Sequence, residues 1–99
     1  MTDHEILSAF PPGFLAEVAG ILRAGSKRLG VAANETGGGQ TLADHVSHAK
    51  GHLADAERAV MVGDQAQDPD TGASQWAHVA ARSALAYGLE LAEAGEGQK

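Results

Sequence analysis

The sequence contains no cysteine, and only four of its 99 residues are aromatic. Without cysteine the chain can form neither a disulfide framework nor a thiolate metal site. Large side chains for a core are also few, because twenty of the apolar residues are alanine. A small alanine-rich core of this kind is marginal on its own. We therefore expect one domain over residues 1–99, which gains further burial by forming a homo-oligomer.

Basic residues are scarce as well: seven Lys and Arg stand against thirteen Asp and Glu, a formal net charge of −6. Non-specific binding to DNA or RNA relies on a basic surface, so neither is an expected partner. A small phosphorylated ligand stays open, because a local basic cluster or a bound cation can outweigh the global charge. No apolar run approaches a membrane span, and the first twenty residues lack a signal-peptide pattern. These absences predict a soluble cytoplasmic protein without a membrane partner.

Capping signals and periodicity predict a short and then a longer helix in the first third of the chain. Thr2 and Glu5 form a capping-box pattern for a short helix that runs to Phe10. The pair Pro11–Pro12 opens the second helix, and Gly30 is a natural C-cap. One stripe of this helix is apolar: Phe14, Val18, Ile21, Leu22, Gly25 and Leu29.

Two further helices are predicted after a Gly-rich loop at 31–40. Thr41 and Asp44 form a capping box for a helix that reaches Gly63. Its apolar stripe comprises Leu42, Val46, Ala49, Leu53, Ala56 and Val60. An acidic turn (64–74) leads to a last helix, capped by Ser74 and running to about Glu93, with a frayed tail at 94–99. That helix is apolar on two sides, which is typical of the middle of a bundle or a subunit interface. The prediction is an all-α fold, a small helical bundle of three main helices plus a short N-terminal one.

Three histidines, His45, His48 and His52, lie beside the apolar stripe of the 41–63 helix. Spacings of three and four residues stack their side chains one turn apart, which is the geometry by which a helix chelates a metal. His78 on the last helix can face His48 or His52 across the hairpin. These side chains are compatible with metal ligation, with direct contact to a phosphate or base, and with ordinary interfacial hydrogen bonding, and the last interpretation is favoured.

The acidic turn offers a second set of metal ligands in Asp68 and Asp70. Mg²⁺ prefers a few carboxylates together with substrate phosphates, so this pair suits it. Asp-Pro-Asp-x-Gly is also common turn chemistry, and that interpretation is favoured. If a divalent metal binds, its candidate ligands are His48, His52, Asp68 and Asp70, and the metal is either Mg²⁺ or a transition metal.

Basic residues near the end of the second helix and on the last helix are candidates for binding phosphate. Lys27 and Arg28 follow one another, and Arg82 lies one turn after His78. Basic side chains at a helix C-terminus also offset the macrodipole, which explains Lys27 and Arg28 without a ligand. The predicted ligand-binding set is Lys27, Arg28, His48, His52, His78 and Arg82; no nucleophile–base–acid set can be identified.

The order of these segments resembles a family of small, often phage-encoded proteins, named for the N-terminal domain of dATP/dGTP diphosphohydrolases. The resemblance covers about residues 10–91 and rests on "PPGFLAEVAGILRAGSKRLG", "DHVSHAKGHL", "DPDTG" and "QWAHVAARSALAYGLEL". The basic turn is matched by Lys27 and Arg28, and the histidine-bearing helix by His48 and His52. The acidic-Gly turn is matched by Asp68, Asp70 and Gly72, and the closing helix by His78 and Arg82.

One departure from this family concerns the start of the last helix. A His-Leu-x-His pattern is replaced here by Gln75-Trp76-Ala77-His78, which removes one imidazole. This departure weighs against hydrolysis more than against nucleotide binding.

The resemblance implies a phage-type protein that acts in a bacterial host and binds a nucleotide or related phosphorylated ligand. If the protein hydrolyses this ligand, the resemblance implies that a divalent metal takes part. Two alternatives stay open. The first is a non-catalytic sponge that sequesters a nucleotide immune signal as an anti-defence protein, and the second is a ligand-free interaction bundle.

Overall fold

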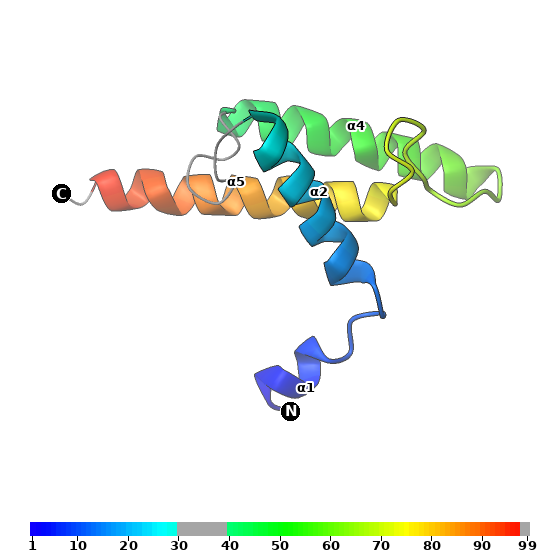
Figure 1. Ribbon diagram of the computed structural model, residues 1–99, viewed down its shortest axis with the longest axis horizontal. Helices are drawn as coiled ribbons and strands as arrows, with labels where there is room; N and C mark the ends of the chain where they lie inside the picture. The colour runs from blue at the N-terminus through cyan, green and yellow to red at the C-terminus, as the bar shows by residue number, and fades with distance from the viewer. Residues whose placement is uncertain (30–39, 98–99) are drawn as a thin grey trace.

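The computed structural model describes residues 1–29 and 40–97, and for residues 26–29, 96 and 97 it describes the backbone only. Four helices make up this part of the chain: α1 (Asp3–Leu7), α2 (Phe14–Leu29), α4 (Leu42–Met61) and α5 (Gln75–Gly97) (Figure 1). The described ranges contain no strand, and one isolated bridge joins Gln67 to Ser74. The predicted all-α bundle of three long helices and a short one is confirmed.

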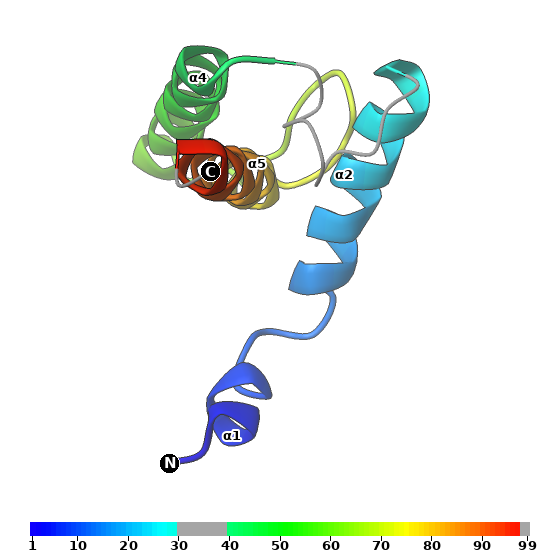
Figure 2. The same cartoon turned by 90° about the vertical axis from the view of Figure 1, so that its left-hand side faces the viewer.

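The last helix, α5, lies in the middle of the bundle, as the two apolar sides of its sequence predict. α4 runs antiparallel to it on one side and α2 packs against it on the other (Figure 2). α1 lies apart from all three and buries no residue. The radius of gyration is 14.8 Å, against about 13 Å for a compact domain of this length. None of the described helices is both long and apolar enough to cross a membrane.

The most buried apolar side chains of the described residues are all alanine: Ala56, Ala66, Ala77 and Ala81. Alanine extends no further than its Cβ, so α4 and α5 can approach each other closely. Four polar residues are equally inaccessible: His45, Asp68, Gln75 and His78. The buried residues of α4, α5 and the loop that joins them are therefore small alanines and polar side chains.

The predicted apolar face of α4 is partly wrong. Val46, Leu53 and Val60 of that stripe are 45%, 47% and 60% exposed. The face that meets α5 is instead the row Leu42, His45, Ala49, His52, Ala56 and Ala59. A periodicity argument counts histidine as polar and assigns it to the edge. Here the histidines form hydrogen bonds with side chains of α5, and the small alanines allow close packing, so the helix turns this row inward.

The ends of all four helices differ from the prediction, and α4 stops at Met61 rather than at Gly63. α1 stops at Leu7 rather than at Phe10, because the next amides bond three residues back, as in Phe10 N–H to the Leu7 carbonyl. α2 begins at Phe14 rather than at Pro11, because Gly13 has a φ of 85°, outside the helical region. α5 continues past Glu93 to Gly97. The predicted C-cap Gly30 and most of the predicted 31–40 loop lie outside the described residues.

The capping box at the start of α4 is confirmed. The Asp44 backbone N–H donates to Thr41 Oγ1 at 3.1 Å, and the Thr41 N–H donates to Asp44 Oδ2 at 2.9 Å. The bond from the Thr41 backbone lowers the pKa of the Asp44 carboxyl, because it favours the ionised form. Because the folded pKa is depressed, this contribution is present at neutral pH and is lost as the pH falls through it.

Replacement of Thr41 by alanine should destabilise the fold. Loss of the N-cap acceptor leaves an amide of α4 unsatisfied, which costs about 1 kcal/mol and lowers Tm by roughly 4–8 °C. Thr2→Ala is the matched control: Thr2 also caps a helix, but α1 buries no residue, so its loss should leave Tm unchanged. Thermal unfolding followed by circular dichroism measures both. Equal effects of the two substitutions would contradict this account.

The outer face of α5 is the surface on which we expect chains to associate. Trp76 and Tyr87 are 47% and 68% exposed, and their separation of eleven residues places them on one side of the helix. Sedimentation should show association at micromolar concentration, and Tyr87→Glu should weaken it. Leu15→Glu, which changes an exposed leucine of α2, should not. A monomeric mass at every concentration would rule the prediction out.

Candidate metal centre

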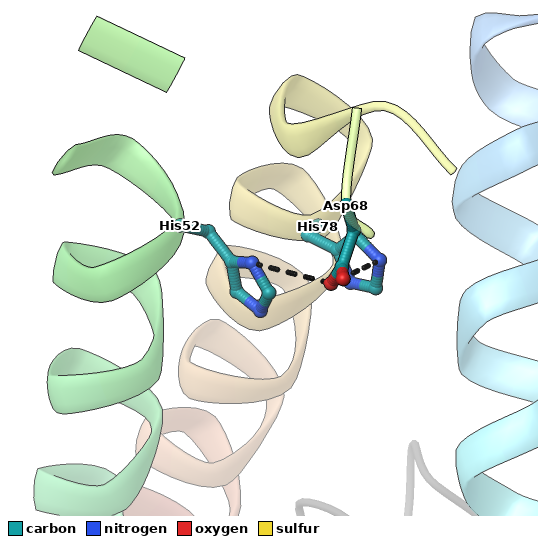
Figure 3. A group of neighbouring side chains, drawn as sticks. All are labelled: His52, Asp68 and His78. Atoms are coloured by element: carbon teal, nitrogen blue, oxygen red, sulfur yellow. Dashed lines mark ion pairs between the residues drawn. The ribbon is translucent and has the colours of Figure 1, made fainter. Parts of the chain in front are cut away.

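Three side chains from separate segments meet beside the first turn of α5: His52 from the middle of α4, Asp68 of the connecting loop and His78 of α5 (Figure 3). Asp68 Oδ2 lies 3.9 Å from His52 Nδ1 and 3.4 Å from His78 Nε2. One potential ligand atom from each residue lies within 4.8 Å of the others. His78 and Asp68 are buried and His52 is half-buried, so this group, the His–Asp–His cluster, is largely shielded from water.

The loop that carries Asp68 is held by its own backbone hydrogen bonds. The Asp68 N–H donates to the Ala73 carbonyl and the Gly72 N–H donates to the Asp68 carbonyl, both at 2.8 Å. Gly72 has a φ of 74°, a left-handed conformation that glycine adopts without strain. The Gln75 N–H donates to the Ala66 carbonyl at 2.7 Å, which joins the loop to the first residue of α5. This turn places the Asp68 carboxylate beside the two imidazoles.

The Asp68 side chain also organises its own loop. Its Oδ1 accepts the Asp70 N–H at 2.8 Å, an Asx-type contact, while Oδ2 faces the histidines. The predicted turn role and the predicted ligand role of Asp68 therefore use different oxygens. The Asp70 side chain is exposed and is not part of the cluster.

The two imidazole rings of the cluster are stacked. Their centroids are 4.4 Å apart and their planes differ by 11°. His52 Nδ1 contacts Gln75 Oε1 at 2.6 Å, and His78 Nε2 contacts Thr71 Oγ1 at 2.8 Å. The stack is thus held from both sides by neutral polar partners.

Burial lowers the pKa of His78, because the charged ring would lose its hydration. The neighbouring His52 lowers this pKa further, whereas the Asp68 carboxylate acts in the opposite direction. The lowered pKa favours the neutral form of His78. Neutral imidazole is the form that binds a metal, because the ligand lone pair must be free of its proton.

The His–Asp–His cluster opens into a cavity of about 530 Å³ between α2, α5 and the loop. Arg82 and Leu85 of α5 line the cavity further along, and Ile21 and Leu22 of α2 form an apolar wall. Glu17 of α2 also lines it, and its Oε1 accepts the Ser74 N–H at 2.5 Å. This volume is within the range of small-molecule sites.

Arg82 is held in place by two side chains beside the cavity. Its Nη1 contacts Gln40 Oε1 and lies 3.2 Å from His45 Nδ1. Because a guanidinium can only donate, His45 Nδ1 is the acceptor in this contact. His45 is 1% exposed and thus acts as a buried support for Arg82.

The structure brings together only part of the predicted site. His52, Asp68 and His78 meet, and Arg82 lines the same cavity. His48 is exposed and lies outside the cluster, because the row through His45 and His52 is the one that faces α5, so its role as a ligand stays a prediction. Lys27 and Arg28 are residues of α2 whose side chains lie outside the described part of the chain.

Three supporting residues were missed by the sequence argument: Gln75, Thr71 and Gln40. The only sequence signal for Gln75 was that it occupies a position where the family pattern has a histidine. Thr71 belongs to the Asp-Pro-Asp-x-Gly turn, which gives no indication of a contact with a histidine. Gln40 is the last residue of the Gly-rich loop, where no periodicity indicates a partner.

Two imidazoles and one carboxylate form a ligand set that suits a transition metal. Imidazole favours zinc, iron, nickel or copper, whereas Mg²⁺ prefers an all-oxygen shell. Metal–ligand bonds of about 2.0–2.2 Å place ligand atoms about 3–3.5 Å apart, so around an ion the ligand atoms would have to move closer together and one of the two stacked rings would have to turn toward it. Of the two metals considered from the sequence, the geometry favours the transition metal.

Models of known protein families, curated proteins and solved structures were each searched, and none gave a match to this chain. The resemblance to the diphosphohydrolase family therefore stays a prediction, and the function is argued from the site itself.

Metal binding should depend on His52 and not on His48. His52→Ala removes one of three ligands, so the affinity for Zn²⁺ or Mn²⁺ should fall by more than the ~10- to 100-fold lost with an outer-shell partner. His48→Ala, the same substitution one turn earlier on α4, should bind like the wild type. Isothermal titration calorimetry measures both. A comparable loss in His48→Ala would show that the ion sits elsewhere.

Proposed function

We propose that this protein binds a nucleotide or a related phosphorylated ligand together with a transition metal, in the manner of a metal-dependent nucleotide diphosphohydrolase domain. One observation carries the proposal: the His–Asp–His cluster and Arg82 line the same cavity of about 530 Å³. A cation on the cluster and a guanidinium nearby would contact different oxygens of one polyphosphate.

The charges around the cavity favour a ligand that arrives with a cation. Three carboxylates (Glu17, Asp68 and Asp70) line it, against Arg82 as the one cationic side chain among the described lining residues. A phosphate would be repelled by this set unless a bound divalent ion reversed the local charge. Metal-dependent binding follows from this balance.

Arg82 is suited to contact a phosphate because its position is fixed in advance. It lies one turn after His78 on α5, so both side chains face the same cavity. Contacts to Gln40 and His45 restrain the guanidinium, so little conformational entropy is lost when a ligand binds. The apolar wall of Ile21, Leu22 and Leu85 offers a surface for the nucleobase.

A bound transition metal would neutralise phosphate charge and lower the pKa of a bound water, which is the chemistry that hydrolysis requires. In this proposal His52, Asp68 and His78 would hold the ion, and Arg82 would orient the phosphate. Pyrophosphate or phosphate release from nucleoside triphosphates, with and without Mn²⁺ or Zn²⁺, tests turnover directly.

The alternative of a non-catalytic sponge uses the same cavity, and a chelator separates the possibilities. A sponge that relies only on Arg and Lys would keep its ligand in EDTA, whereas the carboxylate-rich cavity predicts that binding is lost. A thermal-shift screen of nucleotides and cyclic nucleotides, with Zn²⁺, Mn²⁺ or EDTA, should therefore show stabilisation only when metal is present. Stabilisation that persists in EDTA would refute the metal-dependent mode.

Arg82→Ala should weaken binding of the nucleotide found in that screen by about ten- to a hundredfold, equivalent to about 1.5–3 kcal/mol for a charge-assisted contact. Arg82→Lys should also weaken it, because lysine lacks the planar fork that matches a phosphate. Arg23→Ala is the matched control, since Arg23 is exposed on α2 and does not line the cavity. If Arg82→Ala lowers Tm but the folded protein binds with unchanged affinity, Arg82 is structural.

A further inference from the structure

Gln75 is a buried polar residue to which the proposed function assigns no role. It is the first residue of α5 and is 2% exposed. Its side-chain Oε1 lies 2.6 Å from His52 Nδ1 on the neighbouring helix, a short contact for a hydrogen bond. Its backbone N–H is bonded to the Ala66 carbonyl. The main chain is therefore fixed, and the amide reaches across to α4.

This contact determines which nitrogen of His52 carries the proton. A carboxamide oxygen can only accept, so His52 Nδ1 must donate, and the neutral ring has its lone pair on Nε2. The Asp68 carboxylate does not compete for this proton, because its Oδ2 is 3.9 Å from Nδ1, beyond hydrogen-bond range. Nε2 is thereby left as the basic nitrogen of His52.

The two rings of the stack are held unequally. Gln75 is buried, whereas Thr71, which contacts His78 Nε2, is exposed. The lone pair of an imidazole nitrogen lies in the plane of its ring. The lone pairs of two stacked rings therefore lie in separate parallel planes, and both can point at one ion only if one ring turns. The short contact with the buried Gln75 restrains the His52 ring, whereas the His78 ring is restrained by its own burial and by Asp68 Oδ2, 3.4 Å from its Nε2.

We propose that Gln75 is the positioning residue of the metal centre: it fixes His52 as the Nδ1–H tautomer, which leaves Nε2 as the ring nitrogen with a lone pair for a metal. This inference rests on the proposed function for its metal, but the tautomer is a property of the protein alone. Metal-binding histidines in proteins commonly donate their second N–H to an oxygen acceptor, which orients the ring and raises its basicity. The Gln75 amide oxygen supplies that acceptor here.

The tautomer is tested on the wild-type protein by ¹⁵N NMR of the imidazole nitrogens, at a pH above neutrality and without metal. We expect a protonated Nδ1 and an unprotonated Nε2 for His52. The reverse pattern would overturn the proposal, because it would mean that the Gln75 amide donates rather than accepts.

Two substitutions then separate orientation from packing. Gln75→Met keeps an unbranched side chain of similar length but removes the acceptor, so the tautomers of His52 should mix and Zn²⁺ affinity should fall by about ten- to a hundredfold. Gln75→Glu keeps an acceptor oxygen, so it should retain the Nδ1–H tautomer and the affinity. Circular dichroism checks that both fold; if Gln75→Met does not, the wild-type spectrum and Gln75→Glu still decide the question.

The outcomes distinguish this inference from the proposed function. If the wild type binds Zn²⁺ and Gln75→Met binds it equally well, the role of Gln75 is refuted and the metal centre stands. If both substitutions weaken binding equally and lower Tm together, Gln75 only holds α5 to α4, and the inference also fails. If the wild type binds neither Zn²⁺ nor Mn²⁺ while His52 shows the Nδ1–H tautomer, the metal function is refuted and the orienting contact is confirmed.

Discussion

The close packing of α4 against α5 is the constraint on which the candidate site depends. Ala56 on α4 and Ala77 and Ala81 on α5 are almost completely buried. Because no side chain extends beyond Cβ at these positions, imidazoles from two different helices can stack with centroids 4.4 Å apart. A larger residue at Ala56 or Ala77 would push the helices apart, because packed interiors accommodate added volume by shifting the backbone. The cluster is thus a consequence of small residues that have no chemistry of their own.

The buried polar residues form pairs that join different segments of the chain. His52 meets Gln75, His78 meets Thr71, and His45 meets Arg82. Burial of polar groups lowers stability unless they are hydrogen-bonded, and satisfied groups favour one specific arrangement over its competitors. An interior of alanine and polar pairs therefore contributes specificity more than stability. The exposed Trp76 and Tyr87 are apolar surface that the single chain leaves uncovered.

The sequence was sufficient for the features that depend on local chemistry. The capping box at Thr41 and Asp44 and the number of long helices follow from signals a few residues apart, and the structure confirms both. Which face of α4 turns inward was not predictable in this way, because hydrophobic periodicity favours the row through Val46. The choice between His48 and His52 depends on that rotation. Partners such as Gln75 depend on the hairpin that brings α5 back along α4, a long-range arrangement that no local pattern contains.

The acidic loop links the ligand cluster to the opposite wall of the cavity. It carries Asp68, and its Ser74 N–H is bound by the Glu17 carboxylate of α2. α2 packs against α5 over a smaller surface than α4 does, so this hydrogen bond is one of the contacts that position the α2 wall. A shift of the loop would therefore move the Asp68 carboxylate and the α2 wall together. The geometry of the cluster and the width of the cavity are consequently coupled through one segment, and a ligand that touches both would stabilise the loop in a single position.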